Sequence, residues 1–76
     1  MRFSVGDIVT HPGHWDVQDG EVVRVKFTIT RIEPLSLYGW SVSSDDDVDG
    51  DINIVATAKD GRCRYFNKKD LEACHG

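Results

Sequence analysis

The sequence predicts an all-β domain of five short strands that curl into a partly open barrel, with one short helical turn near the C-terminus. Three observations predict this class. Glycine and aspartate interrupt the 76-residue chain at short intervals, no interval offers an apolar face with helical spacing, and several segments alternate apolar with polar residues. A chain of this length forms one domain, residues 1–76, and buries only about 60% of its unfolded surface, so its core is small.

The first two strands are predicted near residues 7–10 and 22–32. In the second, apolar residues alternate with polar ones in the period of a half-buried strand: Val23, Val25, Phe27 and Ile29. Ile32 falls on the opposite parity, because the pattern slips by one residue at 30–31. This slip predicts a bulge or a sharp bend, which a small sheet needs in order to curl back on itself.

Two further strands are predicted on either side of an acidic stretch, residues 44–51. Their alternating apolar residues are Tyr38, Trp40 and Val42 before the stretch, and Ile52, Ile54, Ala56 and Ala58 after it. This arrangement is typical of a hairpin, so we expect the sequence SDDDVDGD to form its connection.

The fifth strand is expected after Asp60-Gly61, a strong two-residue turn signal. Either Cys63 and Tyr65 or Arg64 and Phe66 face inward there, and parity alone leaves both arrangements open. Asn67 is a good helix N-cap, and Leu71 follows it as a packing contact, so residues 68–74 are expected to contain one helical or 3-10 turn. Five strands and one turn in so few residues indicate an SH3-like, partly open barrel.

The acidic stretch has three interpretations, in order of preference. Clustered aspartates keep a hairpin tip solvated and discourage edge pairing with other chains. They also attract a basic partner surface, and this interpretation makes Asp45, Asp46, Asp47 and Asp49 candidate partner-binding residues. The least favoured interpretation is a calcium loop. The stretch begins as D-x-D-x-D-G, but Ala56 stands where the bidentate glutamate is required.

A basic segment near the end of the chain favours an alternative, nucleic-acid-binding function. Cations interleaved with aromatic residues contact phosphates and stack on bases, and the candidate residues are Arg62, Arg64, Tyr65, Lys68 and Lys69. The simpler interpretation is that the aromatic rings pack in the core while the cations are solvated. The formal net charge of −4 disfavours broad attraction to phosphates.

No metal, cofactor or catalytic residue is expected. The soft ligands His11, His14, Cys63, Cys74 and His75 match no closed zinc pattern, because neither cysteine belongs to a Cys-x-x-Cys pair. We expect His11 and His14 in the first loop, and we expect free thiols. No local motif arranges a nucleophile beside a base, so the chain is not expected to be an enzyme. The sequence has no secretory signal and no apolar run long enough to cross a membrane, so a cytoplasmic protein is expected.

The N-terminal segment RFSVGDIVTHPGH, residues 2–14, resembles the opening of SH3-like and Tudor-like domains, in which F-x-V-G-D-x-V leads into the first strand. With the added His-Pro-Gly-His, it is closest to the RNA-polymerase-interacting domains of CarD regulators and transcription-repair coupling factors. The resemblance implies an entry turn at Gly6-Asp7 and a core that begins with Phe3, Val5 and Ile8. It also implies a barrel that docks on RNA polymerase by pairing strand edges.

We therefore expect a non-catalytic protein-interaction module, a bacterial or phage transcription regulator that binds RNA polymerase or an associated factor. His14 and Trp15 join the aspartates of the acidic stretch as candidate partner-binding residues, because interface anchors are often tryptophan. The alternative role for Trp15 is to cap one open end of the barrel. The alternative function is a KOW-like or Tudor-like module that binds nucleic acid through the basic segment, residues 59–69.

Overall fold

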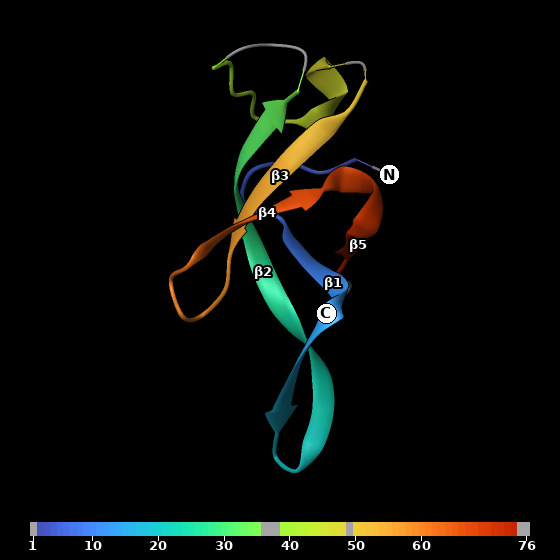
Figure 1. Ribbon diagram of the computed structural model, residues 1–76, viewed down its shortest axis with the longest axis vertical. Coiled ribbons are helices and arrows are strands. Elements are labelled where there is room, and N and C mark those ends of the chain that lie inside the picture. The colour runs from blue at the N-terminus through green and yellow to red at the C-terminus, as the bar shows by residue number, and fades with distance from the viewer. Residues whose placement is uncertain (1, 36–38, 49, 75–76) are drawn as a thin grey trace.

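A computed structural model describes residues 2–35, 39–48 and 50–74. In these residues the chain is all-β, with five antiparallel strands in one open sheet and two single-turn 3-10 helices (Figure 1). The elements are β1 (Ile8–Gln18), β2 (Glu21–Pro34), η1 (Asp45–Asp47), β3 (Ile52–Thr57), β4 (Cys63–Asn67), η2 (Lys68–Asp70) and β5 (Glu72–Ala73). The all-β prediction is confirmed.

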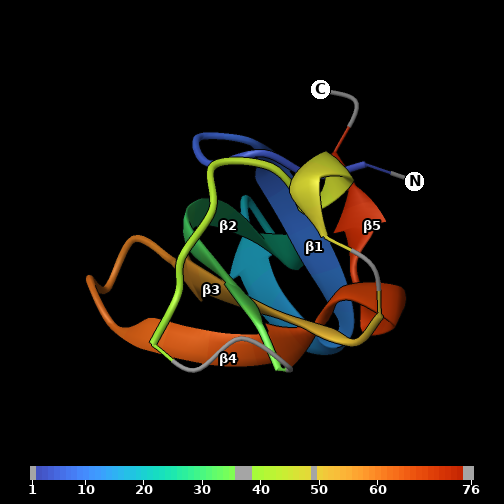
Figure 2. The same cartoon turned by 90° about the horizontal axis from the view of Figure 1, so that it is seen from above.

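The strands follow the order β4-β3-β2-β1-β5, and every neighbouring pair is antiparallel. The sheet curls around one interior without closing (Figure 2). Its core collects side chains from the N-terminal segment, from the first four strands and from the segment after η2: Phe3, Val9, Phe27, Ile29, Ile32, Ile52, Ile54, Ala56, Phe66 and Leu71. No helix in the described ranges has the length and apolar character that a membrane crossing requires.

The predicted slip in β2 is a bulge in the structure. Ile29 pairs with Ala56 and Arg31 pairs with Val55, so Thr30 is the extra residue opposite β3. Ile29 and Ile32 are therefore both buried although their parities differ. The alternation of β2 and its break are confirmed, because this register places Phe27, Ile29 and Ile32 all inside.

The predicted third strand is wrong. Tyr38 lies outside the described residues, Trp40 is 65% exposed and outside any strand, and Val42 forms only an isolated bridge to Ile32. The partner of β3 is β2 instead, so the acidic stretch is part of a long connection, residues 35–51, rather than a hairpin tip. A pattern of three alternating residues is too short to replace the long apolar face of β2 as the pairing partner of β3.

The C-terminal predictions are largely confirmed. β4 pairs with β3, and Phe66 rather than Tyr65 faces the core, being 7% exposed against 61%. The connection between them spans residues 58–62, longer than the predicted two-residue turn. Asn67 caps η2, its side chain accepting a hydrogen bond from the backbone N–H of Lys69. The sequence did not predict β5, because two residues carry no periodic signal.

Near the N-terminus, Phe3 is buried as predicted, and the entry turn forms where Asp7 N–H donates to the carbonyl of Ser4. The prediction that Val5 and Ile8 begin the core is wrong, because Val5 is 47% exposed and Ile8 is 40% exposed. Val9 takes the inward position of β1 opposite Phe27. A shift of one residue in the strand register exchanges the inward and outward side chains, and the sequence motif does not define the register.

The first loop expected around His11 and His14 belongs to β1. This strand runs on to Gln18, with an irregular register between Thr10 and Trp15, and pairs with β2 along a long hairpin. Figure 1 shows the hairpin projecting from the rest of the sheet. The molecule is elongated, 43 × 23 × 19 Å, and its radius of gyration is 12.7 Å. A compact domain of this length has a radius of about 11 Å, so the hairpin extends the molecule measurably.

Candidate functional site

The projecting hairpin is built by the last four residue pairs of β1 and β2. They run from Trp15 opposite Arg24 to Gln18 opposite Glu21. The two-residue turn places both Asp19 and Gly20 at positive φ, 54° and 80°. This turn type matches the right-handed twist of the strands, and an Asp-Gly dipeptide favours it. The hairpin is therefore encoded locally.

One face of the hairpin is apolar and exposed. Val17 lies directly opposite Val22, and Trp15 precedes Val17 by two residues, so the three side chains share a face. Trp15 is 53% exposed, Val17 66% and Val22 65%. Such side chains lose contact with water when a partner covers them. We call these three residues the apolar hairpin face.

Trp15 is held in place although it is exposed. Its indole Nε1–H donates a hydrogen bond of 2.8 Å to the carbonyl oxygen of Pro12, and the Arg24 guanidinium lies over the ring, 5.4 Å from the centroid. Arg24 also forms an ion pair with Glu72 on β5. A ring that is already oriented loses little conformational entropy when it binds, which favours its use as an anchor.

Acidic side chains lie on the other face and at the tip of the hairpin. Asp16 and Glu21 alternate with the apolar residues along the strands and so point away from the apolar hairpin face, and Asp19 lies in the turn. In the described part of the chain none of the three forms an ion pair; Asp16 accepts only the backbone N–H of Val17. The hairpin thus has one apolar face, with carboxylates behind it and at its tip.

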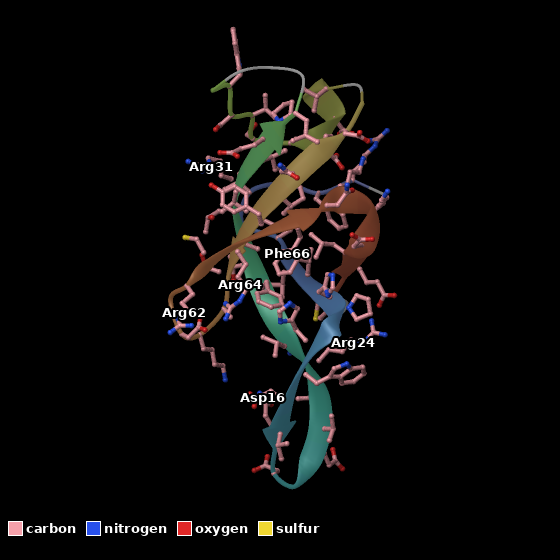
Figure 3. All side chains as sticks on the ribbon, viewed as in Figure 1. Asp16, Arg24, Arg31, Arg62, Arg64 and Phe66 are labelled. Atoms are coloured by element: carbon pink, nitrogen blue, oxygen red, sulfur yellow. The ribbon has the colours of Figure 1, made fainter. Side chains whose placement is uncertain are left out.

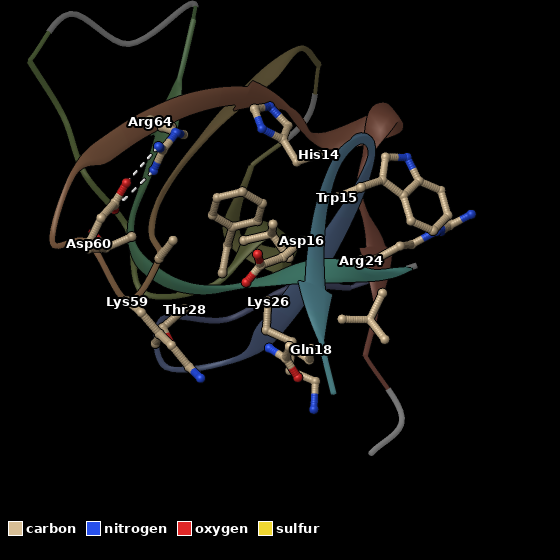
Figure 4. Close-up of a pocket in the computed structure, with 15 residues that line it drawn as sticks. His14, Trp15, Asp16, Gln18, Arg24, Lys26, Thr28, Lys59, Asp60 and Arg64 are labelled. Atoms are coloured by element: carbon tan, nitrogen blue, oxygen red, sulfur yellow. Dashed lines mark hydrogen bonds and ion pairs between the residues drawn. The ribbon is translucent and has the colours of Figure 1, made fainter. Parts of the chain in front are cut away.

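The hairpin also borders a groove of about 830 Å³, which is lined by Trp15 and Arg24 as well as by residues of the other face. Figure 4 shows His14 and Asp16 on the hairpin side of this groove, and Asp60 paired with Arg64 on the other side. Side chains of β2 that continue the core, including Val25 and Phe27, also line it. The groove separates the hairpin from the β3–β4 connection, so the hairpin stands away from the rest of the sheet.

The groove wall at the β3–β4 connection carries a two-point ion pair. Arg64 donates to both carboxylate oxygens of Asp60, at 3.2 and 2.8 Å. The hydrogen bond from Arg64, followed by one from the backbone N–H of Arg62, lowers the pKa of Asp60 to about 2. The same bond raises the pKa of Arg64. A depressed carboxyl pKa means that this stabilisation is present at neutral pH and is lost as the pH falls below the ordinary value of 3.8.

The predicted partner-binding residues separate into two groups. His14 and Trp15 lie on the hairpin strands, whereas Asp45 and Asp46 lie on η1, toward the other end of the long axis (Figure 1). Asp49 and the side chain of Asp47 lie outside the described residues. The fold does not bring the two groups together, so a single small partner surface does not reach both.

Asp45 is turned inward. Its side chain is 1% exposed, and the Lys68 ammonium lies 2.8 Å from one carboxylate oxygen. The contact is a charge pair without hydrogen-bond geometry, since neither oxygen has a hydrogen-bond partner among the described residues. Asp46 is accessible and pairs with Arg2 at 3.0 Å. Of these two aspartates, only Asp46 offers its carboxylate to the surface.

The alternative, nucleic-acid-binding residues do not form one cationic face. Arg64 is paired with Asp60 and Lys68 with Asp45, while Arg62 and Lys69 are exposed. Figure 3 places Arg62 and Arg64 beside the β3–β4 connection. Tyr65 accepts a hydrogen bond from Arg31 of β2, and both residues pair with Val55 of β3, so this bond crosses over Val55. Tyr65 thus covers the outer side of the sheet.

No metal site is present in the described part of the chain: no three His, Cys, Asp or Glu side chains gather there in an arrangement that could hold an ion. Cys63 and Cys74 are free thiols, the first exposed. His11 and His14 pack against aromatic rings of the core instead.

The sequence interpretation missed Val17 and Val22. A signal for them exists, because Trp15 and Val17 alternate before Asp19-Gly20, and Val22 mirrors Val17 across that turn. Read together, these residues predict a hairpin with one apolar face.

Comparisons with known proteins found no matching family model, no matching curated protein and no matching solved structure. The resemblance of the N-terminal segment to polymerase-interacting domains stays a prediction.

Proposed function

We propose that this chain is a non-catalytic protein-interaction module that docks through its projecting hairpin. The observation that carries the proposal is the apolar hairpin face: three large apolar side chains, each more than half exposed, gathered on a hairpin that stands away from the core. Exposed apolar groups that lie together and are rimmed by polar residues mark interaction sites. Trp15 is the anchor, and Val17 and Val22 extend the contact.

The partner we propose is RNA polymerase or a factor associated with it, which makes the chain a bacterial or phage transcription regulator in the cytoplasm. The support is the N-terminal segment, residues 2–14, which leads directly into Trp15. An SH3-like barrel identity belongs to the same proposal. It is supported by the strand order β5-β1-β2-β3-β4 and by a 3-10 turn that precedes the last strand.

Protein docking accounts for the surface better than nucleic-acid binding. The exposed hairpin carries three carboxylates, Asp16, Asp19 and Glu21, which repel phosphates, and two of the candidate phosphate-binding cations are engaged in ion pairs. Carboxylates at the tip and on the other face of the hairpin favour a partner that also presents basic residues.

Purified bacterial RNA polymerase, immobilised on a biosensor, tests the proposal. We expect Trp15→Ala to weaken binding by at least about tenfold, because truncation of a central tryptophan anchor commonly costs that much. Val22→Lys removes the apolar contact without touching the core and should weaken binding as well.

Trp40→Ala is the matched control. Trp40 is as exposed as the residues of the hairpin but lies in the long connection. Circular dichroism checks that each variant keeps its fold. Equal binding by wild type, Trp15→Ala and Val22→Lys would refute hairpin docking, and the absence of any binding to polymerase would refute the proposed partner.

A further inference from the structure

Two histidines from β1 cover one end of the aromatic core. His11 and His14 meet edge to face with their ring centroids 5.2 Å apart. His11 lies 5.1 Å from Phe66, and His14 lies 5.4 Å from Phe27 and 5.6 Å from Phe66. The rings of the two phenylalanines are 5.0 Å apart. We call His11 and His14 the histidine clasp, because they tie the irregular part of β1 to β2 and β4.

His11 forms a tight turn with Gly13. Its Nδ1 accepts the backbone N–H of Gly13 at 2.9 Å, so the ring proton is assigned to Nε2. The ring also lies close to Gly13, where an added Cβ would come within 3.2 Å of it. This turn fixes the position of the His11 ring, against which His14 packs.

The surroundings of His14 also favour its neutral form. Partial burial lowers the pKa of His14, and the nearby charges of His11 and Arg64 lower it further. Asp60 faces the same groove, but its carboxylate is bound to Arg64. The remaining charged groups near the clasp are Asp16 on β1, Lys26 on β2 and Lys59 before β4, which line the groove, and Glu72 on β5, which is paired with Arg24.

The clasp is connected directly to the docking anchor. Trp15 follows His14 in the chain, and its indole N–H is bonded to the carbonyl of Pro12, between the two histidines. A movement of the segment 11–14 therefore breaks or redirects the contact that orients the Trp15 ring. The β1–β2 register shifts between Thr10 and Trp15 and gives the segment 11–14 no partner on β2, so its movement would leave the flanking pairs in place.

We propose that the histidine clasp is a pH-sensitive hinge: neutral His14, packed against His11, Phe27 and Phe66, holds the segment that orients Trp15 for docking, and protonation of His14 releases this segment and weakens docking. The expected effect on docking rests on the proposed function, but the hinge itself is a property of the free protein and can be measured there. Protonated His14 carries a positive charge in a partly buried position near Arg64, and both its loss of hydration and its repulsion by Arg64 favour movement out of the clasp.

The direction of the effect follows from linkage. Because the pKa of His14 is lower in the clasped state, the released state binds more protons at acid pH. The clasped state is fully favoured above the ordinary histidine pKa of 6.5 and loses stability as the pH falls from there toward the lowered value. Binding through Trp15 should therefore weaken on mild acidification.

NMR of the Trp40→Phe variant tests the hinge, because its only indole signal is that of Trp15. We expect the exchange of this indole proton with water, corrected for intrinsic exchange, to accelerate as the pH falls from about 7.5 to about 5.5. The His11→Asn/His14→Phe double variant keeps an acceptor near Nδ1 and an aromatic ring at position 14. When it is combined with Trp40→Phe, the corrected exchange rate of the Trp15 indole proton should change little over this pH range.

Two results would overturn the hinge: corrected exchange that stays constant with pH, or an equal acceleration in the double variant. Should the double variant fail to fold, the ring carbons of His11 and His14 are titrated in the Trp40→Phe protein. If the pH midpoint of the change in the Trp15 indole signal then matches the midpoint of neither histidine ring, the hinge is refuted.

Polymerase binding supplies the functional readout. We expect affinity to fall about threefold to tenfold over the same range, and to stay constant in the double variant. If Trp15→Ala leaves binding unchanged while the indole responds to pH, the docking proposal fails and the hinge stands. If docking depends on Trp15 but the indole is insensitive to pH, the hinge fails alone.

Discussion

Asp45 and Asp46 are adjacent residues of one type that the fold uses in opposite ways. Asp45 is the buried member, tied to Lys68 of η2 and, through its backbone N–H, to the carbonyl of Phe3. Asp46 remains near the surface with Arg2. A buried charge is tolerated only when another charge compensates it, whereas an exposed pair contributes little. The Asp45–Lys68 pair therefore fastens the long connection to the C-terminal turn.

We expect Asp45→Asn to lower the free energy of unfolding by about 1 to 3 kcal/mol, because Lys68 loses its counter-charge and a buried amide lacks acceptors. Asp46→Asn is the matched control and should change it by less than about 0.5 kcal/mol. Urea unfolding followed by circular dichroism measures both. Equal effects of the two substitutions would contradict the assigned role of Asp45.

At the scale of elements, the β1–β2 hairpin is the part of the fold on which the proposed function depends. Its turn holds Gly20 at φ 80°, in the left-handed region that side chains with branched Cβ atoms avoid. Asp19 lies in the same region at φ 54°, which aspartate and asparagine tolerate. The turn sets the register that places Val17 opposite Val22 and so assembles the apolar hairpin face.

Gly20→Val should destabilise the hairpin locally by about 1 to 2 kcal/mol, the cost of a left-handed conformation for such a residue. We expect faster hydrogen exchange of the amides between Trp15 and Arg24, and weaker polymerase binding. Asp19→Asn keeps a residue that tolerates positive φ, so it should leave both unchanged. Unchanged exchange in Gly20→Val would show that the turn conformation does not determine the hairpin.

At the scale of the whole molecule, charge and shape distinguish the two functions considered. The chain carries a formal net charge of −4, and its long axis of 43 Å separates the hairpin from the acidic connection. Cations that could track a phosphate backbone are spread over several elements, and Arg64 and Lys68 are paired. The negative charge and the dispersed, partly paired cations support the proposed protein docking over nucleic-acid binding.

We expect no salt-dependent binding of the whole chain to a fluorescent DNA duplex or RNA strand at low salt, because too few cations face one side. Fluorescence anisotropy measures this. Binding that falls with added salt and is reduced by Arg62→Glu would instead support the nucleic-acid alternative. Lys26→Glu, which changes the net charge by the same amount outside the basic segment, is the matched control.

Strands were predicted correctly where the alternation of apolar and polar residues was long. The alternation from Val23 to Ile29, the slip before Ile32, the strand at 52–57 and the capped turn after Asn67 all follow from local spacing and propensity. The strand at Tyr38–Val42 failed because three alternating residues do not outweigh long-range pairing. For the site, Trp15 was selected from sequence, but Val17 and Val22 were missed, although they lie at mirrored positions around the Asp19-Gly20 turn.

The sequence alone determined an all-β chain, the inward residues of β2 and β3 and the capped turn after Asn67, because hydrophobic period and capping signals act over a few residues. The tertiary structure decided what each segment pairs with: β2 with β3 across the long connection, Asp45 with Lys68, and the two histidines with the phenylalanines of β2 and β4. Those contacts join residues far apart in the chain. Their free energy depends on burial and geometry that no local pattern contains.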